Sequence, residues 1–428
     1  MCAFINIRGL VKSPLDHPCR PYIWVESLSK KDKVNEVIFS RKVSDRQAKA
    51  LPRPSLSGQQ FRWLPSGEQA LAEMLEAIDA ARHSISLEVY IFQPGELGEK
   101  FRTSLIAAAR RQVRVRVLID AFGSYTLADD FWADLTAAGG ECRRFKLPGI
   151  RRFGLRDHRK LLLCDERRAF INGLNIGPEY AGDGVRQGWR DLGLHLDGDL
   201  ARHLSLAFEE MFSLANFQRR RFTWVRHAIR HRRIESEQAI FLLSAPGWRR
   251  NPMVRLLVHD FSHAKTISIL AAYFLPTPRV MRSLLRAARR GAKVRLILAG
   301  RSDMALMQMA THGLYRRLLQ AGIEIYEYQP QILHAKMIIV DDKVVYAGSA
   351  NLDVRSLHLN YELLARVENQ RLAQEAAAIF QGDLDHSQPI KFEEWARART
   401  WWGRLLSRAA FFLLARLDPY LASGSWRR

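Results

Sequence analysis

The sequence predicts an α/β protein made of two similar halves, each built around a mixed, mainly parallel β-sheet. With 428 residues, the chain exceeds the roughly 250–300 residues that one hydrophobic core usually supports. Strand-like and helix-like segments alternate, which is typical of βαβ units. The same order of segments also occurs twice along the chain, which indicates an internal repeat.

The first 58 residues lie outside this pattern. They show no sustained periodicity and end in a stretch rich in proline and serine, residues 51–58. We expect a poorly ordered basic arm, or a small N-terminal cap. The N-terminus lacks the features of a signal peptide, and no long apolar run predicts a transmembrane helix.

The repeat can be followed segment by segment. A helix-like stretch leads into a buried-strand pattern over residues 84–94, which recurs almost position for position over residues 266–276. A second helix then precedes a strand over residues 113–119, and its counterpart precedes a strand over residues 292–298. The domain prediction is a basic arm (1–58), a first half (59–216), a basic connector (217–240), a second half (241–392) and an amphipathic tail (393–428).

Each half carries the same polar motif, H-x-K-x4-D. Its residues are His158, Lys160 and Asp165 in the first half and His334, Lys336 and Asp341 in the second. Asn175 and Asn351 follow at equal offsets, 175 − 158 = 17 and 351 − 334 = 17, and Gly173 and Ser349 follow at 15. Two such motifs in register with a repeat are far more specific than one.

These residue types suit chemistry on a phosphodiester. Side chains alternate faces along a strand, so each motif histidine shares a face with its lysine. A neutral imidazole can attack phosphorus, while lysine and asparagine side chains neutralise the phosphoryl oxygens. The candidate phosphate ligands are Asn175, Ser349 and Asn351. Asp165 and Asp341 are counted with the catalytic motif, although their position seven residues on favours a structural role on the opposite face.

A nucleophilic histidine also needs an acceptor that orients its second ring nitrogen. Within the second half, Glu362 is the best candidate partner for His334, and within the first half Asp191 is the counterpart for His158. No carboxylate-rich metal site accompanies the motif, so we expect neither a metal nor another cofactor. The four cysteines are scattered without a CxxC pair, which disfavours a zinc ribbon or a disulfide framework.

The doubled motif, with G-x-x-N in one half and G-S-x-N in the other, resembles the phospholipase D superfamily over roughly residues 61–392. Finer features are similar to bacterial cardiolipin synthases of the shorter type without N-terminal membrane helices. The segments that carry this likeness are Ile171–Gly177, Gly188–Asp191, Gly348–Ser356, Leu359–Glu362 and Arg399–Trp402.

The resemblance implies two α/β/α sandwich halves, related by a pseudo-twofold axis, with both motifs facing one active site. It implies a phosphatidyltransferase in which His158 forms a phosphohistidine, and His334 protonates the departing alcohol and then deprotonates the acceptor. The implied substrates are phosphatidylglycerol, with phosphatidylethanolamine as a second candidate donor. Gly173 in place of a serine departs from the second motif and indicates that the two half-sites are not equivalent.

The net charge of +22 points to a polyanionic partner, a nucleic acid or an anionic membrane. Arginines cluster around the first motif (143–159) and in the connector (219–233), where they alternate with aromatic residues. In the tail, Arg404, Arg408 and Arg416 accompany two tryptophans, which suits a helix lying in the membrane plane or one docked on the protein's own core. We expect a peripheral protein on the cytoplasmic face of the bacterial membrane.

Two alternatives belong to other functional classes. A hydrolase acting on lipid or nucleic acid would use the same site with water as acceptor, and the positive charge suits DNA. The tryptophan-led tail makes a nucleic-acid partner the weaker interpretation. A basic binding protein without activity is disfavoured because His, Lys and Asn are intact in both halves.

Overall fold

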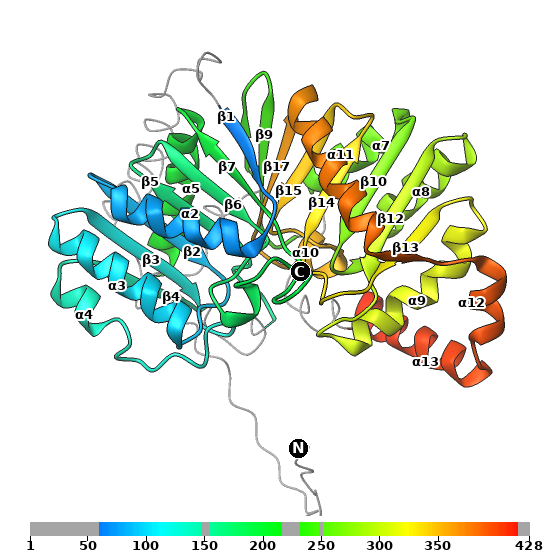
Figure 1. Cartoon of the computed structure of the whole chain (residues 1–428), viewed down its shortest axis with the longest axis horizontal. Coiled ribbons are helices and arrows are strands. Elements are labelled where there is room, and N and C mark those ends of the chain that lie inside the picture. The colour runs from blue at the N-terminus through cyan, green and yellow to red at the C-terminus, as the bar shows by residue number, and fades with distance from the viewer. Residues whose placement is uncertain (1–59, 147–153, 216–231, 248–250, 418–428) are drawn as a thin grey trace, which may run out of the picture. The chain divides into compact units, whose positions relative to one another are not determined.

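The structure is a computed structural model that describes residues 60–146, 154–215, 232–247 and 251–417 (Figure 1). The predicted N-terminal arm, most of the basic connector, two arginines of the first-motif cluster and the last eleven residues lie outside the described residues. Everything below concerns the described part.

The first half contains a seven-stranded sheet in the order β1-β7-β6-β5-β2-β3-β4. Its strands are β1 (Gln60–Leu64), β2 (Ser84–Val89), β3 (Arg114–Asp120), β4 (Glu141–Phe145), β5 (Leu161–Cys164), β6 (Arg168–Asn172) and β7 (Gly193–Asp197). Its helices are α2 (Gly67–Ala80), α3 (Glu96–Arg110), α4 (Ala133–Ala137) and α5 (Leu200–Leu214), with a 3-10 turn over Pro178–Tyr180.

The second half repeats this order as β9-β17-β15-β14-β10-β12-β13 and adds one strand at each edge, β8 and β18. Its main-sheet strands are β8 (Arg232–Glu235), β9 (Ala239–Ser244), β10 (Thr266–Ala271), β12 (Lys293–Ala299), β13 (Glu324–Tyr328), β14 (Lys336–Val340), β15 (Val344–Gly348), β17 (Glu362–Glu368) and β18 (Ser387–Pro389), and β11 (Phe274–Leu275) pairs with β16 (Leu352–Asp353). Its helices are α7 (Pro252–His263), α8 (Pro278–Arg289), α9 (Ala305–Leu319), α10 (Val354–His358), α11 (Gln370–Asp385), α12 (Phe392–Ala398) and α13 (Trp401–Phe412), and a π-helical turn (Leu413–Leu417) follows.

The sheets are mixed, as predicted, but the expectation that parallel pairing predominates is wrong. In the first sheet only β2–β3 and β3–β4 are parallel, while the other four pairings are antiparallel. The cause is local. A connection of only three residues joins each motif strand, β5 or β14, to the next strand, and such a short connection permits only an antiparallel neighbour. The sequence suggested parallel strands because both faces of each sheet are covered. Strands buried on both faces have apolar sequences throughout, which are typical of parallel sheets.

Three hydrophobic cores hold the layers together. One lies between the first sheet and helices α2 and α3, and a second lies between the second sheet and helices α7, α8 and α9. The third is shared: α5 and α11 lie between the two sheets, and apolar residues of both halves meet there. Side chains along β5 alternate between cores, with Leu161 and Leu163 in the shared one and Leu162 in the outer one. Each half is therefore an α/β/α sandwich, and both halves share a helical layer.

The helices begin where the sequence supplies caps. Asn251 and Thr277 cap α7 and α8 with their side-chain oxygens, and each is followed by proline at the first helical position. Asp353 caps α10 by accepting a hydrogen bond from the backbone N–H of Ser356 (2.7 Å).

The C-terminal helix α13 packs along α9 through small residues. Ser407 and Ala410 are buried, and a Cβ added at Gly313 of α9 would lie 3.4 Å from the carbonyl oxygen of Ser407. The opposite side of α13, which includes Trp401 and Trp402, is exposed. In the described parts of the chain, no helix combines the length and the apolar character needed to cross a bilayer.

Candidate active site

The two motif histidines lie just before the strands β5 and β14, and backbone pairing between the halves positions them. Asp157 forms a parallel bridge with Tyr361, and Arg190 forms the equivalent bridge with Leu333. Through these bridges the N–H of His158 donates to the carbonyl of Tyr361 (3.0 Å), and the N–H of His334 donates to the carbonyl of Arg190 (2.8 Å). Tyr361 and Arg190 directly precede Glu362 and Asp191 in the sequence. Each therefore positions the backbone of the histidine of the other half.

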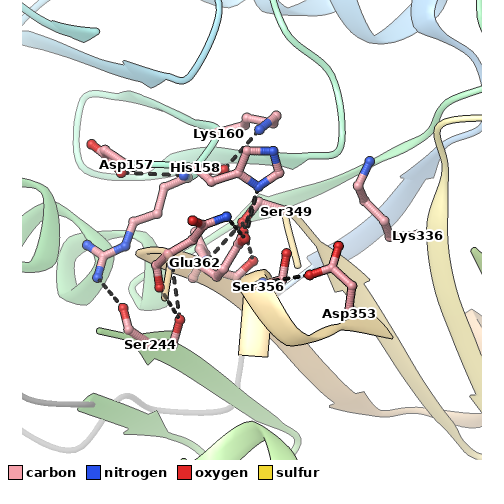
Figure 2. Close-up of polar contacts among 12 residues, drawn as sticks. Asp157, His158, Lys160, Ser244, Lys336, Ser349, Asp353, Ser356 and Glu362 are labelled. Atoms are coloured by element: carbon pink, nitrogen blue, oxygen red, sulfur yellow. Dashed lines mark hydrogen bonds and ion pairs between the residues drawn. The ribbon is translucent and has the colours of Figure 1, made fainter. Parts of the chain in front are cut away.

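The carboxylates consequently pair across the halves. The Nδ1 of His158 lies 3.0 Å from both oxygens of Glu362, as Figure 2 shows, and the Nδ1 of His334 lies 2.5 Å from an oxygen of Asp191. Asp191 and Glu362 contact histidines as expected, but the expectation that each serves the histidine of its own half is wrong. Neither half contains a complete histidine–carboxylate pair, so the two halves together build one site.

This pairing determines the tautomer of each histidine. Because a carboxylate accepts hydrogen bonds, it favours the proton on Nδ1 and leaves Nε2 with a lone pair. Burial lowers the pKa of His158 to about 4, and it also lowers the pKa of His334. At neutral pH both imidazoles of the unliganded protein are therefore neutral, as a nucleophile or a base requires.

The residues that pack against the two carboxylates, Glu362 and Asp191, differ between the halves. The hydroxyl of Ser349 is fully buried and donates to Glu362 (2.5 Å), so it lies behind the carboxylate rather than beside a phosphate. The equivalent Gly173 lies against Asp191, where an added Cβ would come within 2.3 Å of the carboxylate oxygen Oδ1. The prediction that Ser349 contacts phosphate is not supported. A glycine occupies position 173 because a side chain there would collide with the Asp191 carboxylate.

Both motif lysines point to the histidines. Lys160 is 2% exposed and donates to the carbonyl of His158 (2.9 Å), and Lys336 donates to the carbonyl of His334 and lies 3.0 Å from its Nδ1. Burial lowers the pKa of Lys160 to about 7 and lowers that of Lys336 as well. The site therefore holds two partly destabilised ammonium groups, and a phosphate anion would stabilise their charged form.

The two asparagines differ. Asn175 accepts from the N–H of Ile91 (3.1 Å) and donates to the hydroxyl of Tyr180 (2.7 Å), whereas the buried Oδ1 of Asn351 has no hydrogen-bond partner among the described residues. Asn351 therefore has a free acceptor, which suits a hydroxyl group of a substrate, whereas a phosphoryl oxygen would have to bond to its amide NH2 group.

The motif aspartates lie at the other end of their strands. Asp165 accepts hydrogen bonds from the N–H groups of Arg82, His83 and Ser84 (2.7–3.2 Å). Asp341 does the same for Lys265 and Thr266 (2.7 and 2.8 Å). The prediction that these two aspartates belong to the catalytic groups is therefore corrected. Their side chains bind backbone N–H groups and fix the turn after each motif strand.

Aromatic rings complete the walls of the site. Tyr90 meets the ring of His158 edge-on (centroids 4.9 Å apart), and Tyr180 and Trp189 contact His334 (5.3 and 5.5 Å). Tyr180 and Trp189 were not singled out from the sequence. The available signal was their position, since Tyr180 lies five residues after Asn175 and Trp189 two before Asp191.

Replacing Gly173 with alanine should displace the Asp191 carboxylate, because the new Cβ has no room beside Oδ1. We expect activity on the substrate to fall by about 100-fold, since small misplacements of a catalytic group have this effect. Gly382→Ala on α11 is the matched control, because nothing lies within 4 Å of a Cβ there. Initial rates and melting temperatures of both variants check the prediction. A Gly173→Ala protein with normal activity would contradict it.

Comparison with known proteins adds family membership to this geometry. Residues 74–186 and 257–384 match the family described as "Cardiolipin synthase, PLD-like domain". The chain belongs to this family. Cardiolipin synthase B of Salmonella typhimurium is 34% identical over 366 residues, covering 83% of this chain and 88% of the relative. Cardiolipin synthase of Halalkalibacterium halodurans is 32% identical over 350 residues, covering 80% and 69%.

Solved structures support the fold of this family member. A phosphatidylserine synthase of Haemophilus influenzae Rd KW20 superposes with a TM-score of 0.67 at 15% identity, covering 90% of this chain and 99% of that one. A polyphosphate kinase of Porphyromonas gingivalis gives a TM-score of 0.54 at 15% identity, covering 80% and 52%. At these identities the likeness concerns the fold alone. Within the described ranges, no group of three or more His, Cys, Asp or Glu residues could hold a metal ion.

Proposed function

We propose that this chain is a cardiolipin synthase that transfers a phosphatidyl group from a phospholipid donor to phosphatidylglycerol. The observation that carries the proposal is the crossed pairing, in which each histidine is oriented by a carboxylate of the other half. It supplies two imidazoles with different tasks in one buried site. The cardiolipin synthases among its relatives support the choice of lipid.

In the first step, Nε2 of His158 attacks the phosphorus of the donor. A P–N bond forms, the P–O bond to the headgroup alcohol breaks, and Nε2 of His334 gives its proton to the departing oxygen. The negative charge of the bound phosphodiester raises the pKa of His334, which lets it carry that proton. If the donor is phosphatidylglycerol, the alcohol released is glycerol.

In the second step, a primary hydroxyl of phosphatidylglycerol attacks the phosphorus. His334 takes the hydroxyl proton, the new P–O bond forms, and the P–N bond to His158 breaks. The Glu362 carboxylate stabilises positive charge on the His158 ring throughout. Lys160 and Lys336 would balance the charge on the phosphoryl oxygens, and the amide NH2 group of Asn351 could donate a hydrogen bond to one of them, so the transfer needs no metal.

We propose that the protein works as a peripheral enzyme on the cytoplasmic face of the membrane. Its substrates are lipids of the bilayer, and α13 carries exposed tryptophans next to arginines, a composition that suits the headgroup region. We propose residues 393–428 as the membrane-association segment, of which the structure describes residues 393–417.

The direct test is incubation of the pure protein with phosphatidylglycerol, alone and mixed with phosphatidylethanolamine, followed by lipid mass spectrometry. We expect cardiolipin as the main product, together with glycerol or ethanolamine according to the donor. Activity should persist in excess EDTA. Phosphatidic acid as the main product would instead assign a hydrolase, and a requirement for added divalent metal would contradict the mechanism.

The pKa of Lys160 predicts how the reaction depends on pH. Because this pKa is lowered to about 7, the lysine of the free enzyme is charged below that pH and loses its charge above it. Since kcat/KM reports the free enzyme, we expect kcat/KM to fall as the pH rises through about 7, with Lys336 contributing in the same direction. Lys160→Arg should move this alkaline limb to higher pH, because arginine stays charged. An unchanged limb in that variant would exclude Lys160 as its source.

A further inference from the structure

Exposed apolar side chains are concentrated in a few places on the described surface. One group lies on α13 and the turn after it: Trp401, Trp402, Leu405, Leu406, Phe412, Leu413 and Leu417. The others are Phe122 and Tyr125 in the loop after β3, Met304 and Leu306 at the loop after β12, and Val185. The loops after β3 and β12 are equivalent in the two halves, because β3 and β12 occupy the same place in the strand order.

The two loops carry their apolar residues at matching positions. Tyr125 lies five residues after the end of β3 (125 − 120 = 5), and Met304 lies five residues after the end of β12 (304 − 299 = 5). Tyr125 is 76% exposed and Met304 is 42% exposed. A single exposed apolar side chain is ordinary, but each of these places carries two, Phe122 with Tyr125 and Met304 with Leu306, and grouped exposed apolar side chains mark contact surfaces.

Each loop is connected to a catalytic histidine by a carboxylate. Asp120 accepts from the N–H of Phe122 (2.9 Å) and, through its other oxygen, from the N–H of Asp157 (2.9 Å), the residue before His158. In the second half, Asp303 precedes Met304 and accepts from the hydroxyl of Tyr273 (2.7 Å), whose ring faces His334. Both loops therefore border the site.

Helix α13 continues the same surface. Met304 immediately precedes α9, and α13 packs along α9, as Figure 1 shows. On α13, Leu405 and Phe412 lie on the side away from Ser407 and Ala410, which are buried against the protein, and Leu406 beside Ala410 is also exposed. The apolar stripe of α13 is therefore an outward face that the protein's own core does not cover.

Charge identifies the occupant of this surface. Residues 395–417 contain five arginines and no acidic residue, and two tryptophans begin α13. The guanidinium of Arg156 lies over the ring of Phe122, with its Cζ 3.9 Å from the ring centroid. Apolar side chains bordered by arginine and tryptophan match the acyl–headgroup boundary of an anionic bilayer.

We propose that the loops after β3 and β12 and the outer face of α13 form one surface that inserts into an anionic bilayer and holds the mouth of the site against the lipid headgroups. The substrate phosphodiester then reaches the two histidines without leaving the membrane surface. Binding alone tests this surface, so the outcome does not depend on the transferase assignment.

The test places an environment-sensitive NBD label at position 125, 304 or 405, in the full chain with Cys2, Cys19 and Cys142 replaced by serine. On addition of phosphatidylglycerol-containing vesicles, we expect NBD fluorescence to rise at least twofold at all three positions. Position 76 on the outer helix α2 is the control and should not respond. A response at 405 without one at 125 and 304 would overturn the single surface, and no response at any position would overturn membrane insertion.

A second measurement uses no label. The double variant Phe122→Ser/Tyr125→Ser should partition to vesicles containing phosphatidylglycerol at least tenfold more weakly in a flotation assay, whereas Glu76→Ser should partition like the wild type. Both altered residues are exposed, so the fold should persist, which circular dichroism checks. Unchanged partitioning of the double variant would exclude the first-half loop from the surface. Equal binding of the wild type to pure phosphatidylcholine vesicles would contradict the selection for anionic lipid.

Discussion

Replacing His158 with alanine is expected to lower phosphatidyl transfer by about four orders of magnitude or more, because the proposed mechanism uses His158 as the nucleophile and needs His334 as the acid. His334→Ala should have a comparable effect on natural lipids, since the departing alcohol is then unprotonated. Cardiolipin formation, measured by mass spectrometry, checks both. Either single variant with full activity would refute a site shared by both halves.

The two variants should fail at different stages. Because the proposed mechanism places the covalent intermediate on His158, His158→Ala should form no acid-labile adduct with labelled lipid. His203→Ala is the matched control, since His203 lies on α5 away from the site and should leave transfer near the wild-type rate. An adduct that persisted in His158→Ala would reassign the nucleophile.

Most of the architecture could be predicted from the sequence, because an internal repeat and a doubled motif are visible without any structure. The site residues themselves were also identifiable, since His158 and His334 follow the repeat register. Strand direction was harder to predict. Strands such as β5 and β14 are buried on both faces, so their apolar sequences resemble parallel strands. The available signal for antiparallel pairing was the short connection that begins at Asp165 and at Asp341, because aspartate tolerates the positive φ that both residues adopt in these tight turns.

The carboxylate partners could not be predicted from spacing. Asp191 and Glu362 each follow a histidine in the same half by about thirty residues, which makes a local pairing look natural. The actual partners are 204 and 143 residues apart, because the backbone bridges at Tyr361 and Arg190 connect the halves. The contact of Ser349 could not be predicted for a related reason: its motif position indicates the site, but not that its hydroxyl donates to Glu362 behind the histidine.

The crossed pairing makes Glu362→Gln and Asp191→Asn the most informative variants after the histidines. Each should lower transfer by about 100-fold to 10,000-fold, because the histidine loses the carboxylate that fixes its tautomer and balances its charge. The two losses have different chemical causes. In the proposed mechanism, Glu362→Gln impairs His158 as the nucleophile, whereas Asp191→Asn impairs His334 as the acid.

A substrate whose leaving group needs no proton separates these causes. With a phosphatidyl 4-nitrophenyl ester, the first step no longer requires an acid, so the first-turnover burst of nitrophenol from Asp191→Asn and His334→Ala should recover toward the wild-type rate, although later turnovers still need the base. Glu362→Gln and His158→Ala should stay slow, because the attack on phosphorus is still impaired. Pairing within each half would give the opposite result, with Glu362→Gln rescued and Asp191→Asn slow. The leaving group thus reports which carboxylate serves which histidine, and it tests the geometry through a rate that a merely structural defect in either variant would not restore.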